Sequence, residues 1–263
     1  MLCELPVRLG ATVRGEACSL DLVAQSASIL VQGRSRSGKT ALVESVIAQA
    51  VKHPEVVIAG CDPSAILLHP ARHLAHPEWR ATGGATMRPH ADALAALVNE
   101  MDRRIGLLLS RGIDKISVFS VDEPLILVVL EEYPALRAAA EDEDAMEGRR
   151  LTDRCAPRIR RGAARLAREA LKCGIRILAV TQRADAEIIG GNERSNYASR
   201  ITLAMDNPDG VKMLHPYATP DEVEAAHRFP PGTGFVESPD FRLTRVTFDR
   251  FNYCQYRAAL AAR

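Results

Sequence analysis

One stretch of the chain, residues 28–50 with the sequence SILVQGRSRSGKTALVESVIAQA, constrains the fold more than any other. Its opening residues are apolar enough for a short buried strand, and residues 39–53 place apolar side chains on one face of a helix. Between the two, Gly33, Gly38, Lys39 and Thr40 fit the P-loop pattern GxxxxGK followed by Ser or Thr at every fixed position. In such a loop, backbone N–H groups surround the β-phosphate, the lysine reaches the β- and γ-phosphates, and the threonine hydroxyl holds Mg²⁺. We therefore predict an ATP site made by Gly33, Arg34, Ser35, Arg36, Ser37, Gly38, Lys39 and Thr40, with Thr40 as a metal ligand.

Further apolar runs predict the strands of an α/β domain. Helical patterns separate these runs, which favours a mainly parallel sheet covered by helices on both faces. The predicted strands are residues 28–32, 56–60, 125–130, 176–181 and 199–205, and a helix is predicted over about 91–110. Two segments near the end, GTGFVES and FRLTRVTF, predict a C-terminal antiparallel hairpin on the edge of the sheet. We expect one domain over residues 1–263, with a hairpin lead-in (1–27), a nucleotide-binding core (28–215) and the edge hairpin with its tail (216–263).

Polar residues at two strand ends supply the rest of the predicted site. Glu131 and Glu132 directly follow the strand LILVVL. In a P-loop ATPase the first acid orients Mg²⁺ and the second polarises the attacking water. Gln182 follows another apolar strand, where a glutamine can hydrogen-bond the γ-phosphate and report its loss. The alternative for the two acids is a pair of surface glutamates at a strand end.

The composition is that of a soluble protein with reduced thiols. The six cysteines form no CxxC pair, and no run approaches the roughly 18 apolar residues of a membrane span. We therefore expect a cytoplasmic protein.

Charge is unevenly distributed along the chain, although the net charge is only +1. Residues 141–147 carry five acids, and residues 149–176 carry ten Lys or Arg against two acids. Wound as a helix, the basic run forms a stripe of Arg158, Arg161, Arg165, Arg168 and Lys172. DNA, the acidic block of a neighbouring subunit and water all remain possible partners of this stripe.

Taken in order, these motifs resemble the FtsK/SpoIIIE family of DNA-translocating ATPases, including the TraB-like transfer proteins of actinobacterial conjugative elements. The resemblance covers almost the whole chain. It is carried by ASILVQGRSRSGKT, VNEMDRRIGLLLSRGIDKI, PLILVVLEEYPALR, and the region ARLAREALKCGIRILAVTQRADAEIIGGNERSNYASRIT. The sequence departs from the family pattern at Glu131, where an aspartate is usual, and at Ala184, where a proline is usual.

The resemblance implies a RecA-like P-loop NTPase that hydrolyses ATP with Mg²⁺ and moves double-stranded DNA through a homo-oligomeric ring. The ring is expected to be a hexamer, acting in plasmid, mobile-element or chromosome transfer. Lys39, Glu132, Gln182 and Arg200 would be catalytic, with Arg200 as the arginine finger and Arg165 as the second choice. Loops after the fourth and fifth predicted strands would contact DNA through Arg183, Asn192, Arg194 and Lys212.

Other expectations concern neighbouring chains. Arg34 and Arg36 would brace a subunit interface, add charge near the phosphates, or face solvent. The chain lacks the family's membrane segments and winged-helix domain, so we expect another chain to supply a membrane-anchored or DNA-reading partner.

Two other functions compete with translocation. Glu131 favours an ATP-binding ring or assembly component of the same family with weak hydrolysis, whereas Glu132 and Gln182 oppose it. A small-molecule kinase is disfavoured by the second acid and by the lack of a recognisable lid.

Overall fold

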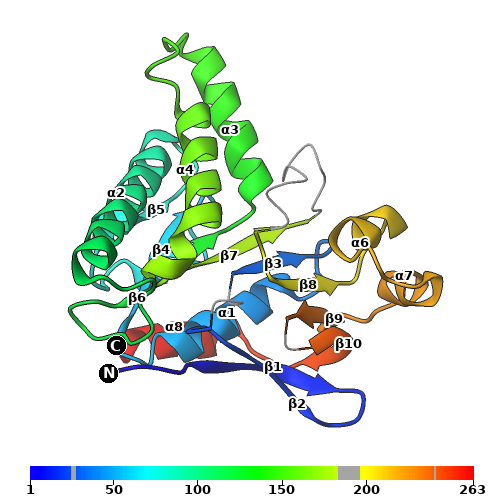
Figure 1. Cartoon of the computed structure of the whole chain (residues 1–263). Coiled ribbons are helices and arrows are strands. Elements are labelled where there is room, and N and C mark those ends of the chain that lie inside the picture. The colour runs from blue at the N-terminus through cyan, green and yellow to red at the C-terminus, as the bar shows by residue number, and fades with distance from the viewer. Residues whose placement is uncertain (25–27, 183–195, 240) are drawn as a thin grey trace. The chain divides into compact units, whose positions relative to one another are not determined.

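The structure is a computed structural model that describes residues 1–24, 28–182, 196–239 and 241–263 (Figure 1). The chain forms two compact units. The first unit contains Met1–Cys3 and Pro54–Ala179, and the second contains Glu4–His53 and Val180–Arg263. Within the described ranges, no helix has both the length and the apolar character needed to cross a membrane.

The first unit contains a parallel sheet with the strand order β7-β6-β4-β5. Its strands are β4 (Val56–Asp62), β5 (Arg80–Thr82), β6 (Leu125–Leu130) and β7 (Ile175–Thr181). Every residue of β4, β6 and β7 is buried, which explains why these strands read as continuous apolar runs in the sequence. The three predicted strands are thus confirmed, whereas the short polar strand β5 was not predicted.

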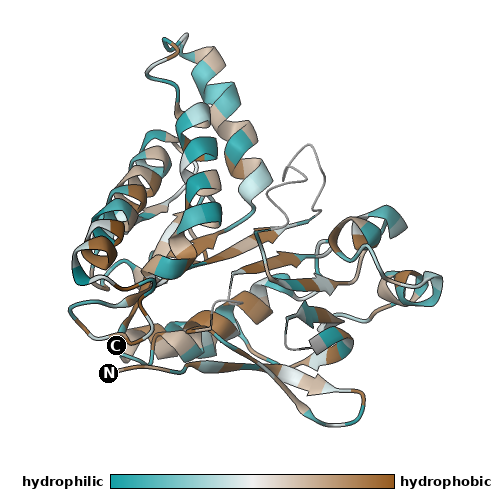
Figure 2. Cartoon of the chain, in the orientation of Figure 1, coloured by the Kyte–Doolittle hydropathy of each residue, from teal (hydrophilic) through white to brown (hydrophobic). Residues whose placement is uncertain are grey.

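Three helices lie against one another in the first unit, with α4 between α2 and α3 (Figure 1). They are α2 (Arg88–Arg111), α3 (Tyr133–Met146) and α4 (Cys155–Glu169). The short 3-10 turns η1 (His69–Ala71) and η2 (Pro77–Trp79) lie between β4 and β5, and η3 (Ala170–Cys173) follows α4. Figure 2 shows many polar residues on α3 and α4 and mostly apolar residues on the strands. Helix α2 is followed by Gly112, whose φ of 64° is easily adopted by glycine and ends the helix.

Arg104 connects α2 with the residues that precede strands β6 and β7. Its side chain is 1% exposed, and its guanidinium donates to the carbonyls of Pro124 and Cys173, both at 2.9 Å. Glu100 accepts a third hydrogen bond at 2.7 Å. A Cβ on Gly174 would lie 2.3 Å from the Phe119 ring, so glycine is required beside this arginine. Arg104 and Gly174, which lie within two of the stretches that carry the family resemblance, therefore have a structural role in this unit.

The second unit contains six strands in the order β2-β1-β10-β9-β8-β3. They are β1 (Pro6–Thr12), β2 (Ala17–Asp21), β3 (Ile29–Gln32), β8 (Ser199–Leu203), β9 (Thr233–Ser238) and β10 (Phe241–Phe248). Strands β3 and β8 are parallel, and all other pairs in this unit are antiparallel. The predicted hairpin β9–β10 is confirmed, but its expected place on the edge is wrong. Strand β1 pairs with β10, with Gly10 opposite Phe248, so the hairpin lies inside the sheet.

The helices of the second unit are α1 (Lys39–Ala50), α6 (Pro208–Leu214), α7 (Pro220–His227) and α8 (Tyr253–Ala261). Only α1 was predicted. Helices α7 and α8 begin with capping boxes, Thr219 with Glu222 and Asn252 with Gln255. Val211 of α6 and Val223 of α7 are buried in one apolar cluster with Phe229. This packing stabilises helices that are too short to be stable alone.

Candidate nucleotide site and its surroundings

The P-loop connects β3 with α1, as the sequence predicts. A Cβ on Gly33 would lie 2.7 Å from Ser37 Oγ and 2.9 Å from Leu203 Cβ. Gly38 has a φ of 105°, and a Cβ there would lie 3.1 Å from the nitrogen of Gly232. That nitrogen donates to the carbonyl of Ser37 at 2.8 Å. The two fixed glycines of the pattern are therefore required by the tight path of the backbone.

Two side chains inside the loop fit a phosphate group. Lys39 is buried, and its Nζ donates to the carbonyls of Gly33 (2.5 Å) and Arg34 (3.2 Å). The Ser37 hydroxyl is buried and has no hydrogen-bond partner within the described residues. Over the fully described helix α1, no side chain caps the N-terminus and no acid lies in the first turn. The loop therefore presents a cation, a buried hydroxyl and the positive end of a helix, a combination that suits the phosphates of a nucleotide.

The other loop residues are more exposed. Ser35, Arg36 and Thr40 lie at the surface of the second unit, and Arg34 is partly exposed. The Arg34 guanidinium pairs with Asp206 at 2.9 Å in the same unit. Arg36 has a φ of 63°, a conformation that side chains other than glycine rarely adopt.

The two predicted acids follow β6 in the first unit. The Glu131 N–H donates to the carbonyl of Cys61 at 3.0 Å, which extends the pairing with β4 by one residue. Glu132 directly precedes α3 and has φ 42° and ψ 54°, in the left-handed region. Holding a non-glycine residue in this conformation costs about 1 kcal/mol or more of folding free energy, and such strain is common at functional sites.

A third acid at a strand end, Asp62, has a structural role. Its carboxylate is buried at the end of β4 and accepts hydrogen bonds from the N–H groups of Ala65, Leu67 and Leu68, at 2.8 to 3.0 Å. These bonds shape the turn after the strand. Glu131 and Glu132, rather than Asp62, therefore remain the candidates for chemistry.

The remaining predicted residues are only partly described. Gln182 is exposed directly after β7, and Lys212 is exposed on α6. Arg183, Asn192 and Arg194 lie outside the described residues.

Both candidate arginine fingers have partners within their own units. Arg200 donates to the carbonyls of Leu214 (3.0 Å) and Tyr197 (3.2 Å). Arg165 binds both oxygens of Asp102 at 2.7 and 3.1 Å, and this ion pair lowers the pKa of the Asp102 carboxyl. A finger role for Arg165 would require release of these carboxylate contacts.

The basic stripe on α4 pairs largely with α2 and with α4 itself. Arg158 contacts Asp92 at 2.6 Å, in addition to the pair between Arg165 and Asp102. The acidic block likewise serves its own unit, since Glu143 and Asp144 both pair with Arg149. For these residues the partner is a neighbouring helix or turn of the same unit.

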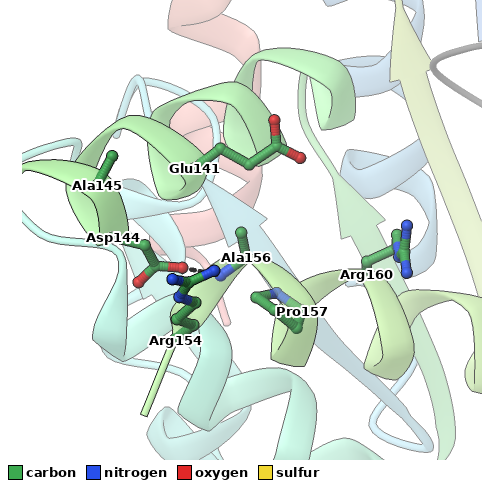
Figure 3. A pocket seen from close by; sticks show the side chains of 7 residues that line it. All are labelled: Glu141, Asp144, Ala145, Arg154, Ala156, Pro157 and Arg160. Atoms are coloured by element: carbon green, nitrogen blue, oxygen red, sulfur yellow. Dashed lines mark hydrogen bonds between the residues drawn. The ribbon is translucent and has the colours of Figure 1, made fainter. Parts of the chain in front are cut away.

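A cavity of about 300 Å³ lies beside α3 and α4, and none of its lining residues belongs to the predicted site (Figure 3). Its lining includes Glu141, Arg154 and Arg160 around Asp144. The Asp144 carboxylate accepts from the N–H groups of Cys155 (2.8 Å) and Ala156 (2.9 Å) and so caps α4. Burial alone would raise the pKa of Asp144, but these bonds and the pair with Arg149 outweigh it and lower the pKa. The acid of this cavity is thus committed to holding α4.

The sequence gives little sign of one polar cluster beside the P-loop. Gln32, Thr202 and His215 are buried together in the second unit, at the C-terminal end of β3. The only local signal is a glutamine that ends the apolar run SILVQ.

Comparisons with known proteins agree with this fold and loop. The FtsK/SpoIIIE family model matches residues 3–124. The DNA translocase FtsK of Treponema pallidum (strain Nichols) is 27% identical over 217 residues, which cover 77% of this chain and 25% of that protein. The chain thus spans about a quarter of the length of this curated relative.

Two solved structures resemble the chain along almost its whole length. The pCW3 conjugation coupling protein TcpA, in its monomer form with ATPγS, has a TM-score of 0.74 at 19% identity, covering 99% of this chain and 71% of that one. The cytoplasmic domain of the type VII secretion ATPase EccC from Thermomonospora curvata has a TM-score of 0.72 at 19% identity, covering 98% of this chain and 31% of that one. At this identity the two structures show a shared fold.

The fold and the loop together define the class of the protein, which is a P-loop ATPase with a mixed, mostly parallel arrangement of strands. The sequence matches agree with the family that the motifs predicted. The chain is similar to the FtsK/SpoIIIE family, whose model matches residues 3–124, and to a DNA translocase FtsK.

Proposed function

We propose that this chain hydrolyses ATP to move double-stranded DNA. The observation that carries the proposal is the P-loop of the second unit, where Lys39 and the Ser37 hydroxyl, which has no hydrogen-bond partner among the described residues, suit phosphate groups. The matched relative from Treponema pallidum is a DNA translocase, which supports DNA as the substrate that is moved.

The residues of the loop, Gly33 to Thr40, would bind ATP. Lys39 would leave the loop carbonyls and contact the β- and γ-phosphate oxygens, while Ser37 would donate its hydroxyl to a phosphate oxygen. The Thr40 hydroxyl and, through water, the Glu131 carboxylate would supply the oxygen ligands that Mg²⁺ prefers. When bound, Mg²⁺ would neutralise charge that develops on the phosphates.

Hydrolysis itself would depend on Glu132 and Gln182. Glu132 would accept a proton from the attacking water, and its strained backbone is consistent with a residue held for function. Gln182 would hydrogen-bond the γ-phosphate and respond to its loss. Arg200 of a neighbouring subunit would complete the site as an arginine finger.

DNA would be held by cations that contact phosphates, because a motor has to bind any sequence and release it in every cycle. Lys212, exposed on α6, is the described candidate, and we propose Arg183, Asn192 and Arg194 as its companions. The working assembly would be a ring of identical subunits, most simply a hexamer. Another chain would anchor it to a membrane or read the DNA.

One feature favours a second function within the same family. Glu131 stands where the family has an aspartate, and the longer side chain can crowd the water that links the acid to Mg²⁺. In that case the chain would bind ATP and hold an assembly together while hydrolysing slowly.

ATP hydrolysis measured with and without duplex DNA separates these functions. A translocase hydrolyses ATP faster when duplex DNA is present, whereas an assembly component binds ATP and turns it over slowly under both conditions. Lys39→Ala is the negative control, because loss of the cation should abolish ATP hydrolysis and weaken ATP binding. Normal hydrolysis by Lys39→Ala would refute the assignment of the P-loop.

The DNA contacts have their own test. Arg183→Ala combined with Lys212→Ala should weaken binding to all sequences alike and reduce the salt dependence of binding by roughly one to two units of slope. Basal hydrolysis should persist in this double variant. Unchanged affinity and slope would show that DNA binds elsewhere.

A further inference from the structure

A chain of buried polar groups runs through the second unit to the first residue before the P-loop. Gln32, the last residue of β3, donates its two amide hydrogens to Thr202 Oγ1 (2.9 Å) and to the carbonyl of Gly210 (2.8 Å). Thr202 Oγ1 lies 2.8 Å from His215 Nε2. His215 Nδ1 lies 2.6 Å from the carboxylate of Glu237. We call Gln32, Thr202, His215 and Glu237 the relay.

The donors and acceptors of the relay fit one arrangement. The Thr202 hydroxyl accepts from Gln32, so its own hydrogen is available for His215 Nε2. His215 then carries its hydrogen on Nδ1 and donates it to Glu237, a bond that lowers the pKa of the Glu237 carboxyl. Gln32 and Thr202 are fully buried and His215 is 2% exposed, so loss of the Thr202 hydroxyl would leave one amide hydrogen of Gln32 and the Nε2 atom of His215 without this buried partner.

The relay joins the P-loop to the segment that carries Lys212. Gly210 belongs to α6 and His215 ends it. A second pair of contacts runs beside the relay, since the Arg34 N–H donates to the carbonyl of Ala204 at 2.7 Å and the Arg34 guanidinium pairs with Asp206. Residues 204–215, which we call the α6 segment, are therefore fixed to both sides of Gly33.

We propose that His215 is a positioning residue for the α6 segment, acting through Thr202 and Gln32 to link that segment to the P-loop. The relay holds the α6 segment in place against the start of the loop. When ATP binds and Lys39 leaves the carbonyl of Gly33, the change at the loop reaches α6 through Gln32. This inference rests on the proposed ATP site, and it assigns the relay the task of linking that site to Lys212.

Amide hydrogen exchange of the whole chain, with and without ATPγS, tests the relay. In the wild-type protein ATPγS should slow exchange in the P-loop and also in peptides from the α6 segment. Thr202→Val keeps the shape of the side chain but removes the hydroxyl, so the α6 segment should lose its response while the P-loop keeps its own. Loss of the two buried hydrogen bonds of the Thr202 hydroxyl should also speed exchange in the α6 segment without ligand by about tenfold or more.

A conservative variant separates the relay from simple packing. Thr202→Ser keeps the hydroxyl and removes only a methyl group, so it should retain the wild-type response of the α6 segment. A packing role would give the opposite order, with Thr202→Val closer to the wild-type protein than Thr202→Ser. His53→Asn changes a histidine of the same unit outside the relay and should leave both responses intact.

Glu237→Met is the second test variant, for use if Thr202→Val does not fold. Glu237 is the partly exposed end of the relay, so its replacement should disturb the core less. It removes the acceptor of His215 and should weaken the response of the α6 segment. A folded Thr202→Val or Glu237→Met that keeps the full wild-type response would overturn the relay. P-loop protection without any response of the α6 segment in the wild-type protein would overturn the relay alone. Absence of P-loop protection by ATPγS would instead refute the proposed ATP site on which it rests.

Discussion

The strained backbone of Glu132 predicts that glycine is more stabilising than alanine at this position, the reverse of the usual order in a helix. Both Glu132→Ala and Glu132→Gly remove the carboxylate, so the difference between them reports the backbone. At φ 42° and ψ 54° an L-residue carries a cost of about 1–2 kcal/mol, which glycine avoids. Glycine also loses more chain entropy on folding, by about 0.5–1 kcal/mol. We therefore expect Glu132→Gly to be more stable than Glu132→Ala by about 1 kcal/mol, since glycine is also the better helix N-cap.

Glu141, exposed within α3, provides the matched control. In a helix interior alanine is favoured, so Glu141→Ala should be more stable than Glu141→Gly by about 1 kcal/mol. Urea unfolding of the four variants measures both differences, and the expected result is opposite signs at the two positions. An alanine at 132 as stable as a glycine would refute the strain. Both Glu132 variants should also lose ATP hydrolysis, and retained hydrolysis would place the general base elsewhere.

Three further predictions concern the first unit. Gly60→Ala should destabilise the protein by at least about 3 kcal/mol, because the new Cβ would lie 1.9 Å from the carbonyl oxygen of Val129. Gly83 also has a positive φ, but no heavy atom of a described residue other than its chain neighbours lies within 4 Å of the position that a Cβ would take, so Gly83→Ala should cost only about 1 kcal/mol. Thermal unfolding of both variants measures the difference. The pKa of Asp144 is lowered in the folded protein, so its stabilising effect is present above the pKa of an unfolded aspartate, about 3.9, and is lost as the pH falls through the folded pKa. The wild-type protein should therefore lose its stability advantage over Asp144→Asn on acidification. A stability difference that does not depend on pH would contradict this. Glu131→Asp should moderately lower kcat because it leaves a gap at the metal, and a clear rise in kcat would instead favour the weakly hydrolysing assembly component.

The sequence predicted those parts of the fold whose cause is local. The strand at 125–130 agrees residue for residue, because a strand buried on both faces needs a continuous apolar run. The place of the C-terminal hairpin was wrong because it depends on the pairing of β10 with β1, from the other end of the chain. Helix α7 was missed although its capping residues are visible in the sequence, since its stability comes largely from packing against Phe229 and its neighbours.

The same difference between local and long-range causes applies to the candidate site. The P-loop is a contiguous motif, so its residues could be named from the sequence. The relay could not, because Gln32 and Thr202 face each other only through the register of β3 with β8. For the basic stripe, periodicity correctly placed Arg158 and Arg165 on one helix face but gave no sign that Asp92 and Asp102 of α2 are their partners.

Displacement of a third strand from duplex DNA tests translocation most directly. A triplex-forming strand bound to a linear duplex is released when a motor moves along the duplex and reaches it. We predict release by the wild-type protein with ATP, and none with ATPγS or with Glu132→Gln, which should bind ATP but not hydrolyse it. Duplex-stimulated ATP hydrolysis without any strand release would contradict the proposal that this chain moves DNA.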